Sequence, residues 1–307
     1  MIKASEQNIG ENFKLADGSS IQCKKLIIGN DVTIGYNTQI FCPEGTVVIG
    51  DQSYIGNDST IRLANFEIGE YCKLHNHALL NGVGNVKIGH NCWIGQNSIL
   101  NGEASLTIGN NVGIGTYSSV WTHGYFGQLI DGCVINSIKD TIIEDDAWLI
   151  GSYNTIFPGV IIGKQAVLMG TSVVTKSLES NRIYSGNPAK DITDKIGAPY
   201  KPLLWDDKKN LLKKTFLEYF EKNNVSYSHE EDSIQLDKKG RILFSLETEI
   251  SEGDVAFVEN ANGFIKQMNG TIFCLTEKKY SKRYSELEIF VKKILSPTVA
   301  RFIPTKE

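Results

Sequence analysis

The chain has 307 residues, a formal net charge of −4 and 41% hydrophobic residues. This length allows one or two domains with a buried core, and the near balance of charge favours neither nucleic acid nor an anionic membrane surface as a partner. No apolar run approaches the roughly 18 residues of a spanning helix, and the polar N-terminal stretch lacks the apolar region of a secretory signal. A cytoplasmic protein without a membrane span is therefore expected.

Most of the first 180 residues follow a repeat in which an apolar residue recurs every six positions, often followed by Gly. This period fits neither an amphipathic helix nor a hairpin meander. It is typical of the short strands of a parallel β-solenoid, which turn on Gly, Asn or Asp. Three hexads form one coil, and the coil starts indicate one to three extra residues per early coil at one and the same corner. These starts are Ile28, Ile49, Ile68, Ile88 and Ile108.

Small residues occupy a second inward position, two places before the middle apolar residue of each coil. They are Val32, Ser53, Cys72, Cys92, Val112 and Ala147. Cys72 and Cys92 are therefore predicted to fill the core as members of a stacked ladder. The six cysteines show neither a CxxC motif nor the His/Cys spacing of a metal site, and disulfides are not expected in a reducing compartment.

Three histidines of the repeat have simple interpretations. His90 holds a turn position that Asn, Asp or Glu fills in other coils, so it is predicted to be a turn residue. His75 stands in place of the usual Gly, and His77 follows two residues later. Zinc requires three such ligands in matched geometry, and the spacing of these histidines does not indicate it. No metal is expected.

The repeat stops at Val120-Trp121-Thr122-His123 and resumes at Thr141, which leaves 124–140 as an inserted loop. Loops of this length are often functional. A His at the base of a loop, beside a rigid wall, is well placed to act as a base. The alternative is a His that closes the loop through a hydrogen bond, and the residues alone leave both interpretations open.

After residue 200 the repeat is absent, and a small α+β domain is predicted over 201–307. Its expected elements are helices at Trp205–Lys222 and Tyr284–Leu295, and strands at Ser233–Leu236, Arg241–Leu246 and Thr271–Leu275. The first helix is amphipathic, with Leu211, Leu212, Phe216, Leu217 and Phe220 predicted to point inward. Capping of the open end of the solenoid, acceptor recognition and assembly are the alternatives for its role.

Four motifs follow one another in the last coils. They are Trp148–Ser152, Ile156–Gly163, Gly170–Lys176 and Gly186–Lys190. This ordered set resembles the bacterial hexapeptide-repeat acyltransferases, and most of all the O-acetyltransferases of the galactoside, maltose, nodulation-factor and capsule or sialic-acid type. The resemblance covers roughly residues 25 to 195. It implies a mainly β, left-handed parallel β-helix over 1–200, and a homotrimer with each active site between neighbouring prisms.

The resemblance also implies roles for individual residues. His123 matches the general base, and Trp148 matches a tryptophan that lines the site in the capsule and sialic-acid enzymes. The backbone around Gly151 and Ser152 matches the N–H donor that faces the thioester. The positions that match the coenzyme A groove are Gly170, Thr175, Lys176 and Lys190.

The chain departs from the family pattern at three places. Trp148–Gly151 is one residue longer than the usual Trp-Ile-Gly, Thr171 replaces a common Gly, and Thr193 stands where a second basic residue is often found. The first departure leaves open which N–H faces the thioester. The third puts one phosphate contact in question.

The predicted function is acetyl transfer from acetyl-CoA to a hydroxyl of a sugar, in a surface polysaccharide or its precursor. His123 would accept the hydroxyl proton, a step worth roughly 10²–10⁴-fold in rate, and one N–H donor to the oxyanion is worth about 3–4 kcal/mol. Two alternatives stand beside it. One is N-acylation of a nucleotide-linked amino sugar, and the other is a non-catalytic solenoid that serves assembly.

Overall fold

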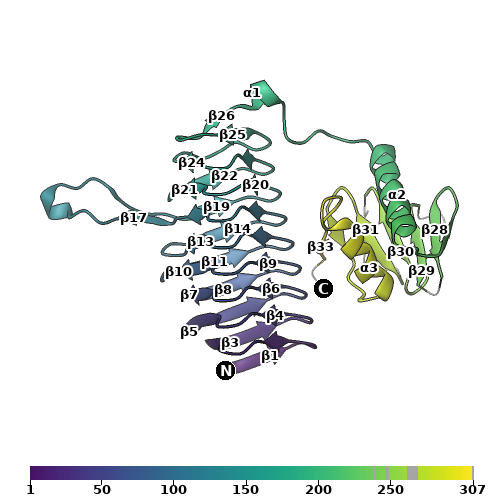
Figure 1. The fold of residues 1–307 in the computed structure, drawn as a ribbon, viewed down its shortest axis with the longest axis horizontal. Coiled ribbons are helices and arrows are strands. Elements are labelled where there is room, and N and C mark those ends of the chain that lie inside the picture. The colour runs from purple at the N-terminus through teal and green to yellow at the C-terminus, as the bar shows by residue number, and fades with distance from the viewer. Residues whose placement is uncertain (238, 246–248, 261–268, 306–307) are drawn as a thin grey trace. The chain divides into compact units, whose positions relative to one another are not determined.

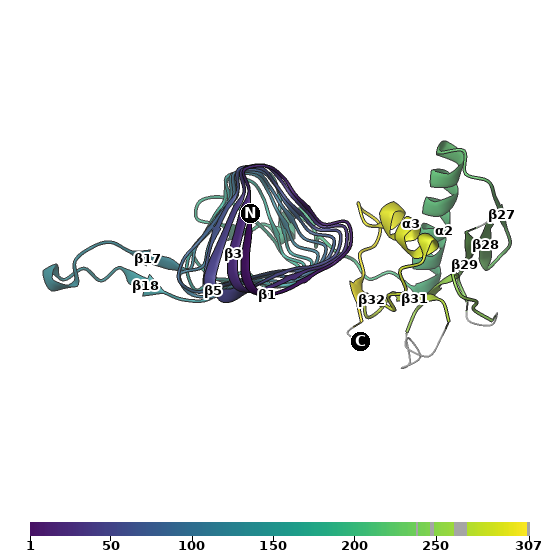
Figure 2. The ribbon, with the colours of Figure 1, turned by 90° about the horizontal axis from the view of Figure 1, so that it is seen from below.

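The computed structural model describes residues 1–237, 239–245, 249–260 and 269–305. The chain forms two compact units, Met1–Lys201 and Pro202–Glu307, and each has a hydrophobic core of its own. The first unit is a stack of coils joined by parallel strands, and it appears end-on as a triangular prism in Figure 2. The predicted mainly β, parallel β-helix is confirmed.

The prism has three faces, of which one is a ten-stranded sheet. The strands of this ten-stranded face are β2 (Lys14–Leu15), β4 (Thr33–Ile34), β6 (Tyr54–Ile55), β9 (Lys73–Leu74), β12 (Trp93–Ile94), β15 (Gly113–Ile114), β20 (Trp148–Leu149), β23 (Val167–Leu168), β25 (Ile183–Ser185) and β26 (Lys190–Asp191). All its pairings are parallel except the last, between β25 and β26. This last pair ends the stack (Figure 1).

The other two faces belong to one fourteen-stranded sheet. They share the long strands β1 (Ile2–Ile9), β3 (Ser20–Ile28) and β5 (Gln39–Ile49). The second face continues with β7 (Thr60–Arg62), β10 (Leu79–Asn81), β13 (Ile99–Asn101), β16 (Ser119–Val120), β21 (Thr155–Ile156) and β24 (Val173–Val174). The third face continues with β8 (Asn65–Ile68), β11 (Asn85–Ile88), β14 (Leu106–Ile108), β19 (Thr141–Ile143) and β22 (Ile161–Ile162).

The repeat positions form the core. The apolar residue of each hexad is buried, with Ile150 as the exception that marks the extra residue of its coil. The ladder of small residues is also buried, so the predicted structural role of Cys72 and Cys92 is confirmed. The Sγ atoms of these two cysteines donate to the carbonyl oxygens of Gly89 and Gly109, both at 3.0 Å, as the Ser53 hydroxyl does to Gly69 at 2.7 Å. In this ladder a thiol replaces a hydroxyl.

Three corners join the faces, and each stacks along the prism. The first corner precedes the strands of the ten-stranded face, at 29–32, 50–53, 69–72, 89–92, 109–112 and 144–147. The second corner follows them, at 35–38, 56–59, 75–78, 95–98, 115–118, 150–154 and 169–172. The third corner separates the second and third faces, at 63–64, 82–84, 102–105 and 121–140. The third corner holds the extra residues of the early coils, and it lies opposite the ten-stranded face (Figure 2).

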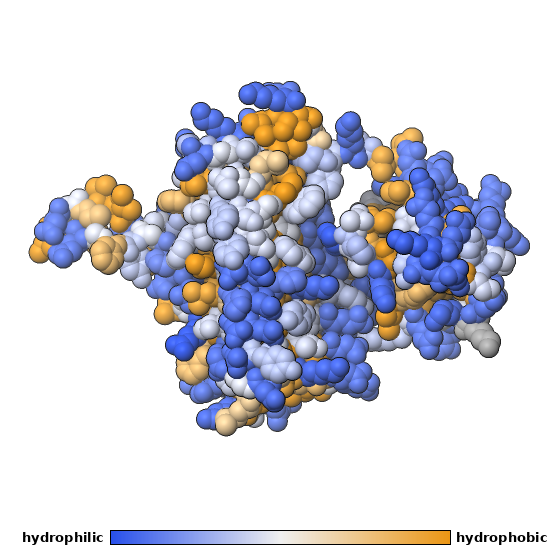
Figure 3. Space-filling model, in the orientation of Figure 1, coloured by the Kyte–Doolittle hydropathy of each residue, from blue (hydrophilic) through white to orange (hydrophobic). Residues whose placement is uncertain are grey.

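The insertion at 124–140 is more regular than the predicted loop. Strands β17 (His123–Tyr125) and β18 (Asn136–Ile138) pair antiparallel, and the 3-10 helix η1 (Leu129–Asp131) lies between them. This hairpin extends away from the third corner (Figures 1 and 2). Its side chains include the exposed apolar residues Phe126, Ile130 and Val134, and apolar surface gathers at its tip in Figure 3.

The last coil ends in a short helix, α1 (Thr193–Ile196). Thr193 is buried; its N–H donates to Asp191 Oδ1 at 2.7 Å, and its Oγ1 accepts from the N–H of Ile183 at 2.8 Å. The peptide bond between Asn187 and Pro188 is cis. The departure at Thr193 therefore has a structural reason, because this side chain connects α1 to β25.

The second unit is an α+β fold. Among its described residues a seven-stranded sheet runs in sequence order, and its strands are β27 (Tyr227–His229), β28 (Ser233–Leu236), β29 (Gly240–Leu243), β30 (Val255–Val258), β31 (Thr271–Cys274), β32 (Lys279–Tyr280) and β33 (Ile303–Pro304). Its helices are α2 (Trp205–Lys222) and α3 (Glu286–Leu295). No helix in the described ranges combines the length and the apolar character needed to cross a membrane.

Helix α2 and strand β28 have the bounds predicted from the sequence, whereas the strand predicted at Arg241–Leu246 already ends at Leu243. Leu246 lies outside the described residues. One inward residue of α2 was predicted wrongly, because Leu211 is 46% exposed while its neighbour Leu212 is buried. Strands β27, β30, β32 and β33 were missed.

Candidate functional site

His123 begins the hairpin at the third corner. Its backbone pairs with Ile138 across β17 and β18, and its half-buried ring lies against the second face. The Nδ1 atom of His123 is 2.8 Å from Oδ1 of Asn101, the last residue of β13. The preceding coil therefore supplies the group that orients the imidazole.

The orientation of the Asn101 amide follows from its other contacts. Its Nδ2 donates to the carbonyl oxygen of Asn81 at 3.0 Å, and its Oδ1 accepts from the Oγ1 of Thr122 at 2.7 Å and from the backbone N–H of Thr122 at 3.2 Å. Because Oδ1 can only accept, Nδ1 of His123 must donate, and Nε2 then carries the lone pair. This is the tautomer that a general base needs.

Both Asn101 and Thr122 are buried, at 1% and 0% exposure. The Thr122 hydroxyl also accepts from the N–H of Ala104 at 3.1 Å, which connects it to the third corner. A buried polar group is costly unless its hydrogen bonds are made. The network around His123 is therefore fixed by the coil and does not depend on the hairpin tip.

Aromatic rings flank the imidazole on two sides. The rings of Trp121 and Tyr125 lie 5.6 Å and 5.1 Å from that of His123 between centroids. The hydroxyl of Tyr125 donates to Glu103 at 3.2 Å, and the charge of Glu103 raises the pKa of Tyr125. The plane of the imidazole makes an angle of 80° with that of Trp121 and of 51° with that of Tyr125, so both contacts are edge or tilted contacts rather than parallel stacking.

Trp148 lies on the ten-stranded face and is 53% exposed. It is the register partner of Gly113 on β15. A Cβ atom placed on Gly113 would come within 2.7 Å of Cδ1 of Trp148, so the indole covers the glycine. Trp148 is thus an outward ring held flat against the sheet, which suits stacking on a ligand.

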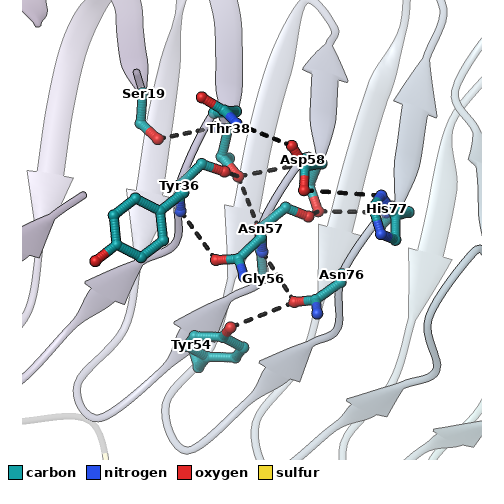
Figure 4. Close-up of polar contacts among 12 residues, drawn as sticks. Ser19, Tyr36, Thr38, Tyr54, Gly56, Asn57, Asp58, Asn76 and His77 are labelled. Atoms are coloured by element: carbon teal, nitrogen blue, oxygen red, sulfur yellow. Dashed lines mark hydrogen bonds and ion pairs between the residues drawn. The ribbon is translucent and has the colours of Figure 1, made fainter. Parts of the chain in front are cut away.

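The second corner changes character along its height. In the lower coils shown in Figure 4, the N–H of Tyr36 donates to Oδ1 of Asn57, and the N–H of Asn57 donates to Oδ1 of Asn76, both at 2.9 Å. Higher up, the same position holds Ser152 and then Gly170, which has no side chain. Within the part of the chain that the structure describes, the N–H of Ser152 donates to no other residue. It is available to a ligand.

The extra residue of Trp148–Gly151 widens the turn at this place. Gly151 has a φ of +75°, and a Cβ atom on Gly115 would lie 1.6 Å from the Gly151 carbonyl oxygen. The Oγ atoms of Thr116 and Ser152 are 2.7 Å apart, so the two turns stack directly. A Cβ atom on Gly170 would lie 3.4 Å from the Ser152 N. Gly151, Ser152 and Gly170 therefore lie together.

Thr171 occupies a left-handed conformation with a φ of 59°. This conformation favours Gly, which is the residue that the family pattern has here. The Thr171 N–H donates to the Ser152 carbonyl oxygen at 2.8 Å and its Oγ1 donates to that of Gly170 at 2.6 Å. The turn is therefore formed in spite of the departure.

Thr175, Lys176 and Lys190 are exposed near the end of the stack. The N–H of Ala189, which precedes Lys190, donates to the carbonyl oxygen of Val173 at 2.8 Å, so the two segments lie side by side at the end of the stack. Neither lysine forms an ion pair with an acidic side chain among the described residues. Their ammonium groups are free to meet phosphates.

The predicted site residues thus form two groups within one chain. His123 is at the third corner, whereas Trp148 is on the opposite face and Gly151, Ser152 and Gly170 are at the second corner. No contact between the two groups is formed in the described part of the chain.

The other histidines have separate surroundings. Nδ1 of His90 accepts from the N–H of Glu70 at 3.1 Å, so its predicted place in a turn is confirmed. His77 lies 4.0 Å from Asp58, and the ring of His75 packs against Trp93 at 4.9 Å. Over the described ranges, no group of three or more His, Cys, Asp or Glu side chains is arranged to hold a metal ion.

Sequence reasoning missed Asn101 and Thr122 as parts of the site. Asn101 follows the apolar residue of its hexad just as the exposed Asn81 does one coil below. Only the return of the chain at Thr122 covers it. The one signal in the sequence was the Thr next to His123.

Comparisons with known proteins agree with the repeat. Residues 85–116 match the family model described as a hexapeptide repeat of succinyl-transferase. A probable macrolide acetyltransferase of Lysinibacillus sphaericus is 57% identical over 53 residues, which are 17% of this chain and 29% of that protein. A chloramphenicol acetyltransferase of Agrobacterium fabrum is 47% identical over 53 residues, 17% of this chain and 25% of that protein. The resemblance to hexapeptide-repeat acyltransferases predicted from the sequence is therefore confirmed.

The chain matches less than a third of the length of these relatives. Among solved structures, the polySia-specific acetyltransferase NeuO is similar with 20% identity and a TM-score of 0.45, over 73% of this chain and 98% of that one. A hexapeptide-repeat acetyltransferase of Vibrio cholerae has 29% identity and a TM-score of 0.32, over 35% and 61%.

Proposed function

We propose that the protein is an acetyl-CoA-dependent O-acetyltransferase whose acceptor is a sugar hydroxyl of a surface polysaccharide or its precursor. The observation that carries the proposal is the 2.8 Å contact between Nδ1 of His123 and Oδ1 of Asn101, which leaves Nε2 free to accept a proton. The match to acetyltransferases supports the acyl class. The sugar acceptor rests on the sequence resemblance and on the exposed ring of Trp148.

In this mechanism Nε2 of His123 accepts the proton of the acceptor hydroxyl as the oxygen attacks the acyl carbon. The resulting imidazolium is stabilised by Asn101 Oδ1, and it then gives the proton to the departing sulfur. General-base catalysis of this kind contributes roughly 10²–10⁴-fold. The N–H of Ser152 donates to the oxygen that becomes negative, which is worth about 3–4 kcal/mol in a preorganised site.

Acetyl-CoA is the acyl donor in this proposal. Lys176 and Lys190, which pair with no carboxylate among the described residues, would bind its phosphates as exposed cations, and Thr175 would offer a hydroxyl beside them. Gly151 and Gly170 add no side chains to the second corner, so the donor can approach the backbone closely at these two positions. The residues present therefore fit this co-substrate.

A site that combines both groups of residues needs a second copy of the chain, because His123 and Trp148 lie on opposite sides of one prism. The hairpin supports the same conclusion. An isolated two-stranded hairpin is marginally stable at best in water, and this one exposes Phe126, Ile130 and Val134. We therefore infer a homotrimer in which His123 of one chain faces the Ser152 corner of the next.

The first test measures thiol release from acetyl-CoA in the presence of a panel of bacterial surface sugars. His123→Ala should lower the sugar-dependent rate by about 100-fold or more, whereas His77→Ala, an exposed His of the second corner, should leave it unchanged. An equal rate in His123→Ala would remove this residue from the mechanism. A base-stable amide product would favour N-acylation, and a failure of coenzyme A to raise the melting temperature would favour a scaffold.

The second test mixes His123→Ala with Trp148→Ala after joint refolding. If each site takes its His from one chain and its Trp from the next, random mixing restores about a quarter of the sites. Sites contained within one chain would stay inactive in every mixture. Light scattering of the wild type gives the copy number independently.

A further inference from the structure

The ten-stranded face carries a second exposed tryptophan below Trp148. Trp93 of β12 pairs in register with Gly113 of β15, which pairs in register with Trp148 of β20. Both rings point outward, since the next residue of each strand is buried, and Trp93 is 42% exposed. The two tryptophans therefore lie in one column along the axis of the stack.

Gly113 makes the spacing between the rings. The indole of Trp148 already occupies the space that a side chain at Gly113 would need. Since neighbouring strands are about 4.8 Å apart, the backbones of the two tryptophans are about 10 Å apart along the axis, and the Trp148 ring extends over Gly113 into the step between them. The column thus presents two flat aromatic surfaces separated by a short step.

Trp93 is held from behind by a residue that the turn does not require. His75 stands where Gly35, Gly56 and Gly95 stand in other coils, and its ring is 4.9 Å from that of Trp93. The ring of Tyr54 in turn contacts the His75 ring edge-on, at 6.5 Å between centroids. The contact with His75 restricts the indole of Trp93, which reduces the entropy lost when a ligand stacks on it.

We propose that Trp93 is a second sugar-binding position, and that Trp93 and Trp148 form a track for an acceptor of several linked sugars. This inference rests on the proposed function, because it takes the acceptor to lie on Trp148. It names the acceptor class more narrowly, as an oligomeric or polymeric glycan that runs along the prism. A free monosaccharide would reach only the Trp148 end.

The alternative occupant is a second copy of the chain, and the column argues against it. A stable protein interface buries about 800 Å² per partner around a contiguous apolar centre. Here the apolar surface consists of two rings, and the next residue down the column is the exposed Lys73. Two exposed rings separated by a glycine, with a lysine below them, fit a chain of sugars, whose apolar ring faces recur from one unit to the next.

The test measures binding by calorimetry without an acyl donor, so that it does not depend on catalysis. The probes are two series of one to six units, β1,4-linked N-acetylglucosamine and α2,8-linked sialic acid. For the wild type at least one hexamer should bind about tenfold or more tightly than its monomer. Trp93→Ala should weaken that hexamer by about tenfold and leave the monomer unchanged, and Trp93→Phe should recover most of the loss.

Two variants complete the comparison. Phe41→Ala removes a ring of similar exposure, 44%, from another face and should change neither ligand. Trp148→Ala should weaken monomer and hexamer alike. The proposal is overturned if no hexamer binds the wild type more tightly than its monomer, or if Trp93→Ala affects both lengths equally. It is also overturned if the variant changes the copy number by light scattering. Loss of thiol release with length-dependent binding intact would instead count against the proposed transferase.

Discussion

The first and second corners of the prism belong to the same coils but differ in how their backbone N–H groups are hydrogen-bonded. Along the first corner, side chains of the next coil accept backbone N–H groups over most of its height. The donors are Glu11, Asn30, Glu70, His90 and Asn110. Along the second corner, among the residues that the structure describes, only Tyr36 and Asn57 donate in this way. The comparison shows that the solenoid closes without the upper acceptors, and that the Ser152 N–H has no acceptor among the described residues.

The largest effect is expected from a variant that removes this difference, by adding a side-chain acceptor for the Ser152 N–H at the second corner. Gly170→Asn places an amide oxygen above Ser152 N, in the manner of Asn57 and Asn76 in the lower coils. A Cβ atom fits there, with its nearest neighbours at 3.4 Å. The captured N–H can no longer serve the oxyanion, so kcat should fall about 100-fold while the melting temperature holds or rises.

Gly170→Ala is the matched control, since it adds the Cβ atom without an acceptor. Its KM for acetyl-CoA should rise as in Gly170→Asn, because both variants narrow the space for the donor, whereas its kcat should stay much closer to that of the wild type. If Ala lowers kcat as much as Asn does, crowding of the donor explains the loss, and the role of the Ser152 N–H is contradicted.

The next largest effect concerns the third corner. There the important group is the buried side-chain amide of Asn101, whereas at the second corner it is the backbone N–H of Ser152. Asn101→Ala removes the acceptor for His123 and for Thr122. We expect kcat to fall by about 10–100-fold, as when a base loses its orientation, with little change in KM for acetyl-CoA. Stability should fall by about 1–3 kcal/mol, because buried donors lose their partner. Steady-state kinetics and thermal unfolding measure the two effects.

Asn81→Ala is the control for this variant. Asn81 is the register partner of Asn101 one coil below, and it is exposed. It should leave kcat unchanged. An equal loss of activity in Asn81→Ala and Asn101→Ala would mean that these asparagines act through the stability of the fold alone.

The sequence could predict the burial of residues that follow the six-residue period. It could not predict burial that arises when a later segment of the chain packs over an earlier coil. Burial of Ile114 or Val120 follows from a six-residue spacing, because each hexad places one side chain inward. Asn101 has the spacing of an exposed residue, and its burial arises only when Thr122 crosses over it. The hairpin was predicted as a loop since Gly124–Asp140 has no clear alternation of apolar and polar residues.

The roles taken from the family resemblance illustrate the same limit. The motif from Trp148 to Ser152 indicated a backbone donor, but the extra residue left its identity open. Among the described residues neither the N–H of Gly151 nor that of Ser152 donates to another residue. We propose the Ser152 N–H as the donor because no side chain stands above it at Gly170. Such a vacancy depends on which coil lies above, and therefore on the register of the stack.

A smaller effect sharpens the comparison within the second corner itself. Asn76→Ala removes the acceptor of the Asn57 N–H and should lower stability by about 1 kcal/mol. Gln96 holds the same position one coil higher, where no such bond joins the described residues. Gln96→Ala should therefore cost nothing measurable in chemical denaturation. Equal losses in the two variants would show that the ladder continues above Asn76.

The smallest effect is a dependence on pH at the lower second corner. Burial, and next the charge of Lys73, lower the pKa of His75 in the folded protein. The unfolded chain, with an ordinary pKa near 6.5, then binds the proton more readily than the folded one. Stability is complete above that pH, falls as the pH drops through about 6.5, and levels off below the folded pKa. His75→Gly, which restores the residue of the neighbouring coils, should abolish this part of the slope in unfolding measured between pH 8 and pH 5. A slope that persists unchanged would assign the acid sensitivity to the carboxylates of the chain, and the ring behind Trp93 would then be as readily protonated as a His on the surface.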